Sequence, residues 1–323
     1  MGNLTVAIIA PPGYAASIGK KSGTSDITSY DCKKGDVTVS IIEPTSYPEK
    51  LASLFYSASS ADIALVVVEK IDASFGECAL MLDCAGVKKG YIVLRGGIGM
   101  EQIAPLIKGL SLESYLQIAD NPVEIRERLM DDALNLDPNE ALMMTVNAGS
   151  VPVDQSFNVK GVGTVVLGNV VEGVMKRHDR VKVLPGGKTG EVRSIQKHDD
   201  EFDWSAKGDR VGLSLKGLEV ADVDRGMVIT NNAALKSDLS ITAEVKIVKY
   251  WPKALEEGMV LHTGHWMQFL ASRIESVKDD GDWRQPTIKL AFDKPLVHLP
   301  GDRAVLCYLD GGKLRVVGSI ALQ

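Results

Sequence analysis

The stretch of sequence that decides the fold lies in the middle of the chain. Residues 157–200 read FNVKGVGTVVLGNVVEGVMKRHDRVKVLPGGKTGEVRSIQKHDD, and residues 206–229 read AKGDRVGLSLKGLEVADVDRGMVI. Short runs of β-forming residues alternate here with Gly and Asp at intervals of about 8–12 residues, which is typical of antiparallel barrels. A second set of short strands follows between Ser240 and Ile320. The pattern therefore predicts two consecutive β-barrels.

The N-terminal part has a different pattern, in which strands alternate with helices. We predict strands at residues 4–10, 36–42, 62–68 and 90–94. Helical periodicity lies between or after them, at residues 47–59, 76–85 and 122–135. Apolar strands separated by helices are typical of a parallel sheet covered on both faces. The sequence therefore predicts an α/β domain over residues 1–138 and barrels over residues 139–232 and 233–323.

The charge of the chain is mildly acidic and unevenly distributed. Its 323 residues include 36 Lys and Arg against 42 Asp and Glu, a formal net charge of −6. Residues 1–140 hold 12 basic and 19 acidic side chains, whereas residues 141–323 hold 24 and 23. Neither part has the broad basic surface of a non-specific DNA-binding protein, so we expect no DNA partner.

The sequence lacks the features of membrane, secreted and metal-binding proteins. No segment approaches the ~20 apolar residues of a membrane span, and the N-terminus MGNLTVAIIA lacks the basic start of a signal peptide. We therefore expect a cytoplasmic protein without a membrane partner. The four cysteines form no CxxC pair and have no metal-ligand spacing, so we expect free thiols in a reducing compartment and no metal site. They are Cys32, Cys78, Cys84 and Cys307.

Separated motifs in the middle stretch are similar, in order and spacing, to domain 2 of elongation factor Tu and its relatives, particularly the selenocysteine factor SelB. These motifs are the turn Gly161–Thr164, then Gly168, Gly173 and Asp179, and finally residues 193–196, 208–213 and 222–226. The C-terminal part resembles domain 3 of the same proteins at residues 261–264, 269–277 and 317–320. The resemblance implies a shortened P-loop-GTPase-like α/β domain followed by two antiparallel β-barrels.

The first domain stands where this family carries its GTPase domain, so its nucleotide motifs can be checked residue by residue. A P-loop has the pattern G-x-x-x-x-G-K-[ST], in which backbone N–H groups and the Lys hold the phosphates. Residues 10–17 read APPGYAAS, and the two prolines remove two N–H donors. The frame from Gly13 to Lys20 also lacks the Ser or Thr that would hold Mg²⁺. The sequence therefore contains no phosphate loop.

The two other nucleotide motifs are also altered. Where D-x-x-G and a water-orienting His are expected, the chain has Glu43 and, at the His position, Tyr47. Where N-K-x-D would read guanine through a carboxylate, the chain reads RGGIG from Arg95. We therefore expect no catalytic residue and no ordinary binding of the family's cofactors, GTP and Mg²⁺. The degenerate positions of the nucleotide site are Gly13, Lys20, Glu43 and Arg95.

One segment of the first domain, KKSGTSDIT at residues 20–28, resembles the switch segment of SelB-like paralogues of methanogenic archaea, including those proposed to serve unusual charged tRNAs. In this family, the first domain and domain 2 enclose the aminoacylated 3′ end of tRNA. The resemblance implies RNA contacts by two arginines and by the turn, namely Arg210, Arg225, Gly161, Gly163 and Thr164. The turn residues also have a purely structural interpretation, since glycine avoids the Cβ clash at positive φ.

Three functions remain open from the sequence. The first is an elongation factor Tu/SelB-like paralogue that binds tRNA or the ribosome without ordinary GTP turnover. The second is a non-catalytic protein-interaction or regulatory module on the same fold. The third is a GTPase that binds its nucleotide in an unrecognised way. The loss of three nucleotide motifs favours the first two, so we expect a protein that is not an enzyme.

Overall fold

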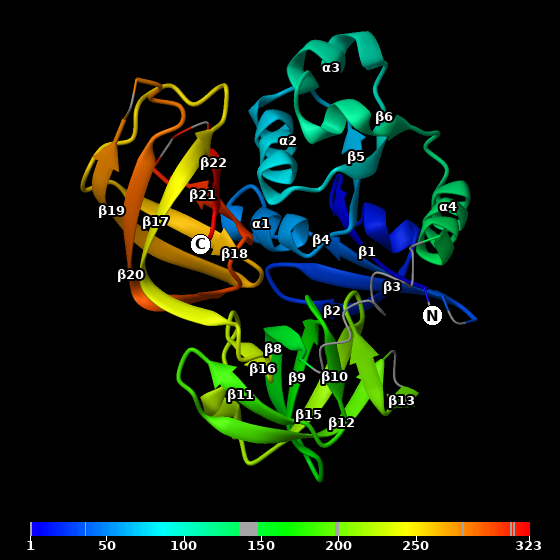
Figure 1. Ribbon diagram of the computed structural model, residues 1–323. Helices are drawn as coiled ribbons and strands as arrows, with labels where there is room; N and C mark the ends of the chain where they lie inside the picture. Colours follow the sequence, from blue (N-terminus) through cyan, green and yellow to red (C-terminus); the bar gives the residue numbers. More distant parts are fainter. Residues whose placement is uncertain are drawn as a thin grey trace.

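Three domains follow one another along the chain, and the first lies against both of the others (Figure 1). The computed structural model describes residues 2–35, 37–135, 148–197, 200–279, 281–310, 312 and 314–323. An α/β domain comes first and two antiparallel β-barrels follow, as predicted from the sequence. The predicted boundary between residues 138 and 139 lies outside the described residues.

The first domain is a seven-stranded sheet with helices on both faces. Its strands are β1 (Gly2–Ile9), β2 (Lys20–Thr24), β3 (Thr28–Lys34), β4 (Val37–Glu43), β5 (Ile63–Val68), β6 (Lys89–Leu94) and β7 (Leu116–Gln117). Its helices are α1 (Leu51–Ser59), α2 (Ala73–Ala85), α3 (Met100–Ile107) and α4 (Pro122–Asn135), with 3-10 turns η1 (Tyr14–Ser17) and η2 (Ser111–Ser114). The sheet order is β2-β3-β4-β1-β5-β6-β7, antiparallel from β2 to β4 and parallel from β4 to β7.

Alternate residues of the central strand β1 enter two different cores. Val6 and Ile8 pack with α4 and η1, whereas Ala7 and Ile9 pack with α1, α2 and α3. Every residue of β4 and β5 is buried, which explains why these strands lack the polar alternation of a one-sided sheet. The carboxyl ends of β4, β1 and β5 therefore lie side by side between two helical layers.

The structure differs from the sequence-based prediction at a few elements of this domain. Helix α4 has the predicted bounds, but the helix predicted at residues 47–59 begins only at Leu51, because residues 44–50 fold into turns that contain Pro44 and Pro48. The β2–β3 hairpin and α3 were not predicted. Strand β2 is a polar edge strand without an apolar face, and α3 is short and contains Pro105.

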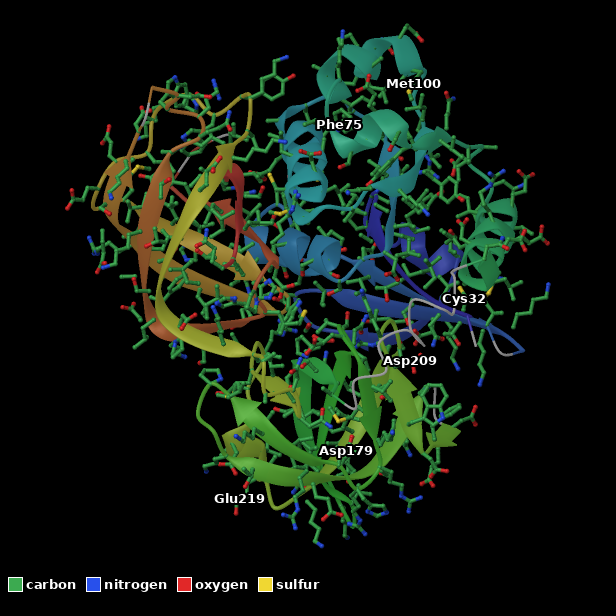
Figure 2. The ribbon with its side chains drawn as sticks, viewed as in Figure 1. Cys32, Phe75, Met100, Asp179, Asp209 and Glu219 are labelled. Atoms are coloured by element: carbon green, nitrogen blue, oxygen red, sulfur yellow. The ribbon has the colours of Figure 1, made fainter. Side chains whose placement is uncertain are left out.

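The second domain is a six-stranded ring of antiparallel strands with small additions. Its strands are β8 (Ser150–Val159), β9 (Gly163–Asn169), β10 (Val174–Lys176), β11 (Arg180–Leu184), β12 (Thr189–Lys197), β13 (Asp200–Phe202), β14 (Trp204–Ala206), β15 (Arg210–Lys216) and β16 (Val228–Thr230), with a 3-10 turn η3 (Val220–Asp222). The order β11-β16-β8-β9-β15-β12 closes through the β11–β12 pairing. Asp209 lies on the side of this barrel that faces the first domain, and Glu219 lies away from it (Figure 2).

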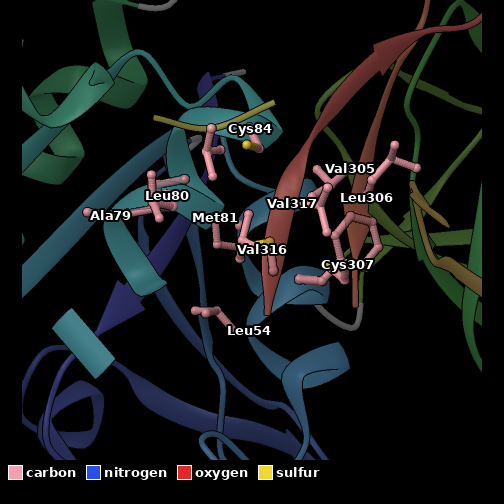
Figure 3. Packing of buried hydrophobic residues seen from close by; sticks show 14 of the residues in the cluster. Leu54, Ala79, Leu80, Met81, Cys84, Val305, Leu306, Cys307, Val316 and Val317 are labelled. Carbon is pink, nitrogen blue, oxygen red and sulfur yellow. The ribbon is translucent and has the colours of Figure 1, made fainter. Parts of the chain in front are cut away.

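The third domain is a closed barrel that shares its core with the first domain. Its strands are β17 (Lys236–Ile247), β18 (Val260–His265), β19 (Gln268–Lys278), β20 (Thr287–His298), β21 (Arg303–Cys307) and β22 (Val316–Ala321), in the order β17-β20-β19-β18-β21-β22. Figure 3 shows Met81 and Cys84 of α2 beside Val316, Val317 and Cys307 of β21 and β22. One apolar cluster therefore runs from the sheet domain into this barrel.

The cysteines, the helix lengths and the clusters of metal-binding side chains bear on the classes that the sequence excludes. All four cysteines are free and buried, as predicted. Within the described ranges, no helix is long and apolar enough to cross a membrane. Nor do three or more His, Cys, Asp or Glu side chains gather, among the residues that the structure describes, in a group able to hold a metal ion.

Candidate functional site

A cleft of about 640 Å³ lies at the carboxyl edge of the parallel strands. The loop after β1, the ends of β4 and β5 and the first turn of α2 line it. Open α/β sheets place their ligands at this edge, where helices on opposite faces of the sheet leave a crevice. Two of the degenerate nucleotide positions, Gly13 and Glu43, lie next to each other in the lining of this cleft. It is therefore the place at which a nucleotide would have to bind.

The carboxylate of Glu43 is bound by a backbone N–H of the loop after β1. Gly13 has a positive φ of 84°, which favours glycine, and its N–H donates to Oε1 of Glu43 at 3.1 Å. Tyr30 O–H donates to Oε2 at 3.0 Å, and Glu43 is only 5% exposed. Backbone N–H groups in such loops normally point at a bound phosphate. Here the protein's own carboxylate uses the N–H of Gly13.

The residues of this cleft do not fit a nucleoside triphosphate with Mg²⁺. Pro11 and Pro12 have no N–H to donate, and the N–H of Gly13 is already bonded to a carboxylate. Burial, followed by the hydrogen bond to Glu43, raises the pKa of Tyr30 to about 12, so Tyr30 remains a neutral donor. A phosphate brought next to the negative charge of Glu43 would be repelled. The cleft therefore offers no phosphate cradle.

The other two degenerate positions do not point a free cation into this cleft. Lys20 is exposed on β2, and its neighbour Lys21 lines the cleft instead. Arg95 forms ion pairs with Asp120 (Nε to Oδ2, 2.6 Å) and Glu69 (Nη1 to Oε1, 2.7 Å). The hydrogen bonds to Asp120 and then Glu69 raise the pKa of Arg95. Arg95 thus links the ends of β5 and β6 to the loop before α4.

Tyr47, at the position where the family has a water-orienting His, is part of the contact with the third domain. Its O–H donates to Oε2 of Glu77 at 3.1 Å. Arg315 of the third barrel donates to both oxygens of that carboxylate, at 3.0 Å from Nε and 2.6 Å from Nη2, and to the carbonyl of Pro48 at 3.0 Å. The Glu77 side chain is 4% exposed. The segment after β4 is therefore held by the third domain.

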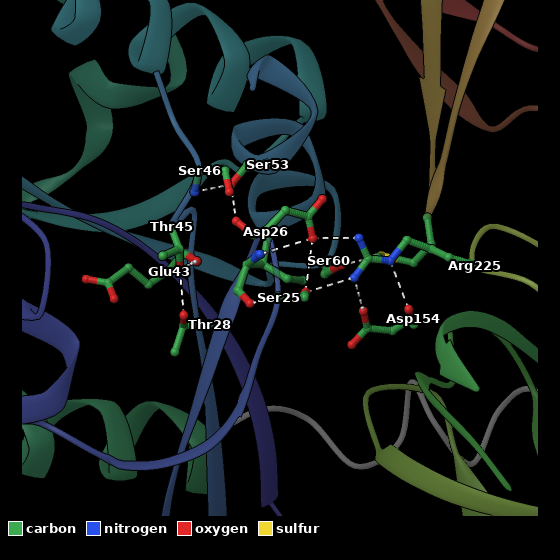
Figure 4. A network of polar contacts seen from close by, with 12 residues as sticks. Ser25, Asp26, Thr28, Glu43, Thr45, Ser46, Ser53, Ser60, Asp154 and Arg225 are labelled. Atoms are coloured by element: carbon green, nitrogen blue, oxygen red, sulfur yellow. Dashed lines mark hydrogen bonds and ion pairs between the residues drawn. The ribbon is translucent and has the colours of Figure 1, made fainter. Parts of the chain in front are cut away.

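Arg225 bridges the first and second domains (Figure 4). Its Nη1 donates to Oδ1 of Asp26 at 2.6 Å and its Nη2 to Oγ of Ser25 at 3.0 Å, both in the loop between β2 and β3. Its Nε donates to the carbonyl of Asp154 at 2.8 Å, and the guanidinium lies 5.3 Å from the ring centre of Tyr56. A guanidinium bound on several sides in this way fixes the relative position of the two domains.

Arg210 joins the same network through Asp154. Its Nη2 donates to Oδ2 of Asp154 at 2.8 Å, while Nη2 of Arg225 lies 3.2 Å from Oδ1 of the same carboxylate. Burial tends to raise the pKa of Asp26, but the hydrogen bond and the charge of Arg225, together with the hydrogen bonds from Ser25 and the backbone, hold that pKa below its usual range. The structure thus brings the two predicted arginines together, with side chains 16% and 26% exposed. Their contact with RNA stays a prediction.

The predicted turn residues lie apart from this network. Gly161 and Gly163 have φ angles of 83° and 101° in the β8–β9 hairpin, as a glycine turn requires. Thr164 is buried, and its hydroxyl donates to the carbonyl of Leu218 at 2.8 Å. The hairpin borders a separate open groove of about 1000 Å³ in the second barrel. This geometry supports a structural role, and the RNA contact of these residues also stays a prediction.

The sequence analysis did not identify the three carboxylates that Arg225 and Arg315 bind. Asp26 lies within residues 20–28, which the resemblance had marked, so a search of that segment for acidic residues could have found it. Asp154 and Glu77 have no comparable signal. Arg225 is 71 residues from Asp154 and meets it through the folding of the second barrel, whereas Arg315 is 238 residues from Glu77 and meets it through the packing of two domains.

Comparisons with known proteins agree with this architecture. A family model described as elongation factor Tu domain 2 matches residues 163–230. The chain is 32% identical over 324 aligned residues to the "Uncharacterized protein MJ0325" of Methanocaldococcus jannaschii, across 98% of this chain and 99% of that protein. It is 26% identical to elongation factor 1-alpha of Saccharolobus solfataricus, across 68% of this chain but only 59% of that factor.

Solved structures of SelB-type factors have the same fold. The apo form of translation elongation factor SelB from Methanococcus maripaludis matches 99% of this chain and 79% of its own length, with a TM-score of 0.80 and 21% identity. A bacterial selenocysteine-specific elongation factor matches 100% of this chain and 58% of its own length, with a TM-score of 0.81 and 19% identity. The chain belongs to one family with the Methanocaldococcus jannaschii protein, and that family is elongation factor Tu/SelB-like.

Proposed function

We propose that this protein is a translation-factor paralogue that binds tRNA, and charged tRNA in preference, without GTP turnover in the cytoplasm. Its kinship with elongation factors supports an RNA partner of this kind. The observation that carries the nucleotide-independent part is the hydrogen bond between Gly13 N–H and Glu43, because a carboxylate there replaces the phosphate that the fold would otherwise bind.

In nucleotide-driven switches, the γ-phosphate orders mobile loops and thereby selects one arrangement of the domains. In this protein, the loop between β2 and β3 and the start of β3 are held by contacts within the chain. Ser53 Oγ donates to the carbonyl of Asp26 at 2.6 Å, the hydroxyls of Thr28 and Thr45 lie 2.5 Å apart, and Arg225 binds the carboxylate of Asp26. An RNA surface between the first two domains would then be present continuously and would not depend on a nucleotide cycle.

The test is a filter-binding titration of the full chain with bulk aminoacylated and deacylated tRNA, each with and without GTP and Mg²⁺. We expect charged tRNA to bind more tightly, with the same affinity in both nucleotide conditions. The affinity should fall steeply with salt, because contacts to phosphates release counterions. Binding only with GTP would contradict the proposal and favour the residual GTPase. No binding in any lane, together with a protein that co-purifies after RNase treatment, would favour the interaction module.

Variants of the second barrel locate the RNA surface. Arg210→Gln and Arg225→Gln should each weaken tRNA binding, whereas Arg180→Gln serves as the matched control on an exposed strand position of the same barrel. Thermal unfolding of each variant separates loss of an RNA contact from loss of the fold. If both variants remain folded and bind tRNA as the wild type does, the surface between the first two domains is not the RNA site.

A further inference from the structure

The cleft at the carboxyl edge of the sheet contains a buried negative charge that no cation of the protein neutralises. Glu43 accepts hydrogen bonds from the N–H of Gly13 and the O–H of Tyr30, both of which are neutral donors. No ion pair reaches Glu43 from the residues that the structure describes. A buried carboxylate loses most of its hydration, and neutral donors replace only part of it. Glu43 therefore favours a positive partner.

The carboxylate also has the capacity to bind such a partner. Its two oxygens offer about four lone-pair positions, and the two hydrogen bonds within the protein leave the others available. Glu43 lines the cleft, and Figure 4 shows its carboxylate pointing away from the Arg225 network. A donor that enters the cleft can therefore reach Glu43 without breaking the bridge between the first two domains.

The remaining charged groups of the cleft are either neutralised or at its rim. Glu69 is paired with Arg95, and the carboxylate of Asp72 accepts the N–H of Phe75 at the start of α2. Lys21 and Lys70 line the cleft with exposed side chains. The buried charge of Glu43 therefore dominates the interior.

The rest of the lining is largely apolar. Contributions come from the loop after β1, from the end of β5 and from α2, and they include Ile9, Pro11, Pro12, Val66 and Phe75. Pockets that bind small molecules combine walls of this kind with a few polar groups that orient the ligand. The volume of about 640 Å³ lies within the usual range for such pockets.

We propose that this cleft binds a small primary amine with an apolar body, whose ammonium group hydrogen-bonds to Glu43. The replacement of a phosphate cradle by a buried carboxylate has inverted the charge preference of the site. The negative charge of Glu43 repels a triphosphate and attracts an ammonium group. This binding site is independent of the proposed contact with tRNA.

The test is isothermal titration calorimetry of the full chain at neutral pH with 2-phenylethylamine. The neutral analogue 2-phenylethanol and the anionic probe inorganic pyrophosphate are titrated for comparison. We expect saturable binding of the amine, binding of the alcohol weaker by about tenfold or more, and no pyrophosphate binding in the cleft. Equal affinity for amine and alcohol, or no amine binding up to about 10 mM, would overturn the proposal.

Glu43→Gln locates the site, because the amide oxygen still accepts the N–H of Gly13 while the negative charge is lost. This variant should bind the amine at least about tenfold more weakly. Glu49→Gln is the matched control, since Glu49 is exposed and lies outside the cleft lining. Unchanged amine affinity in a folded Glu43→Gln protein would contradict the site. If that variant does not fold, the comparison of amine with alcohol on the wild type decides.

Discussion

The first domain meets the two barrels through contacts of opposite character. Against the third barrel, α1 and α2 share one apolar core with β18, β21 and β22 (Figure 3). Phe55 of α1 lies so near Gly264 of β18 that a Cβ at Gly264 would come within 2.5 Å of the ring. Against the second barrel, the described residues form polar contacts, which include those of Arg225 with Asp26 and of Asn3 with Asp209. A cavity of about 200 Å³ remains at that junction.

This difference indicates which parts of the protein behave as one body. Burial of apolar surface is non-directional and insensitive to moderate salt, whereas charged contacts depend on geometry, salt and pH. The first domain and the third barrel should therefore unfold as one unit, reinforced by the buried pair of Glu77 and Arg315. The second barrel has its own apolar core, which includes Val151 and Leu213, so we expect its attachment to the first domain to depend on salt and pH.

The largest effect is expected from the shared apolar core. Met81→Ala removes a fully buried side chain of α2 and should cost about 2–5 kcal/mol. In differential scanning calorimetry it should lower the unfolding temperature of the transition that contains the first domain and the third barrel. Leu213→Ala is the matched control, also fully buried but in the core of the second barrel, and should lower only the transition of that barrel. A single transition that both variants shift alike would show that the two junctions are equally coupled.

A smaller effect is expected from the polar bridge. Arg225→Gln removes hydrogen bonds from a charged donor and should cost about 1.5–3 kcal/mol at the junction of the first two domains. Small-angle X-ray scattering should show an increased radius of gyration, while the cores of both units stay folded. Arg193 donates to the carbonyl of Val162 in its own barrel, so Arg193→Gln should leave the scattering unchanged. An unaltered profile for Arg225→Gln would assign the bridge no role in domain arrangement.

The smallest effect is expected from pH. The pKa of Asp26 is lowered in the folded protein: burial acts to raise it, but the hydrogen bond and charge of Arg225 together with the bonds from Ser25 and the backbone exceed that effect. The stabilisation is therefore fully present above the ordinary Asp pKa of about 3.9, and it is lost as the pH falls through the lowered folded value. Denaturant titrations at pH 6 and at pH 3 should show this loss, because each pH lies about one unit or more from the ordinary Asp pKa. Asp26→Asn should lack this component, and an identical pH dependence in the variant would refute the assignment.

Local patterns in the sequence were sufficient for much of the architecture. Helix α4 has the predicted bounds because its amphipathic repeat is strong, and the barrels follow from short strands separated by glycine and aspartate turns. The altered nucleotide motifs were also readable, since the absence of an N–H at Pro11 and Pro12 is a covalent property of the residues. Strand β2 was missed because a polar edge strand has no apolar period.

The contacts that give the altered site its properties were decided by tertiary structure. Glu43 binds the N–H of Gly13, Arg225 binds Asp26, and Arg315 binds Glu77, and the residues of these pairs are 30, 199 and 238 positions apart in the chain. No local propensity encodes such pairs, because their geometry is set by the packing of whole sheets and barrels. The residue types alone predicted that the phosphate site is lost, whereas only the packed structure reveals that a carboxylate occupies it and that arginine bridges hold the domains.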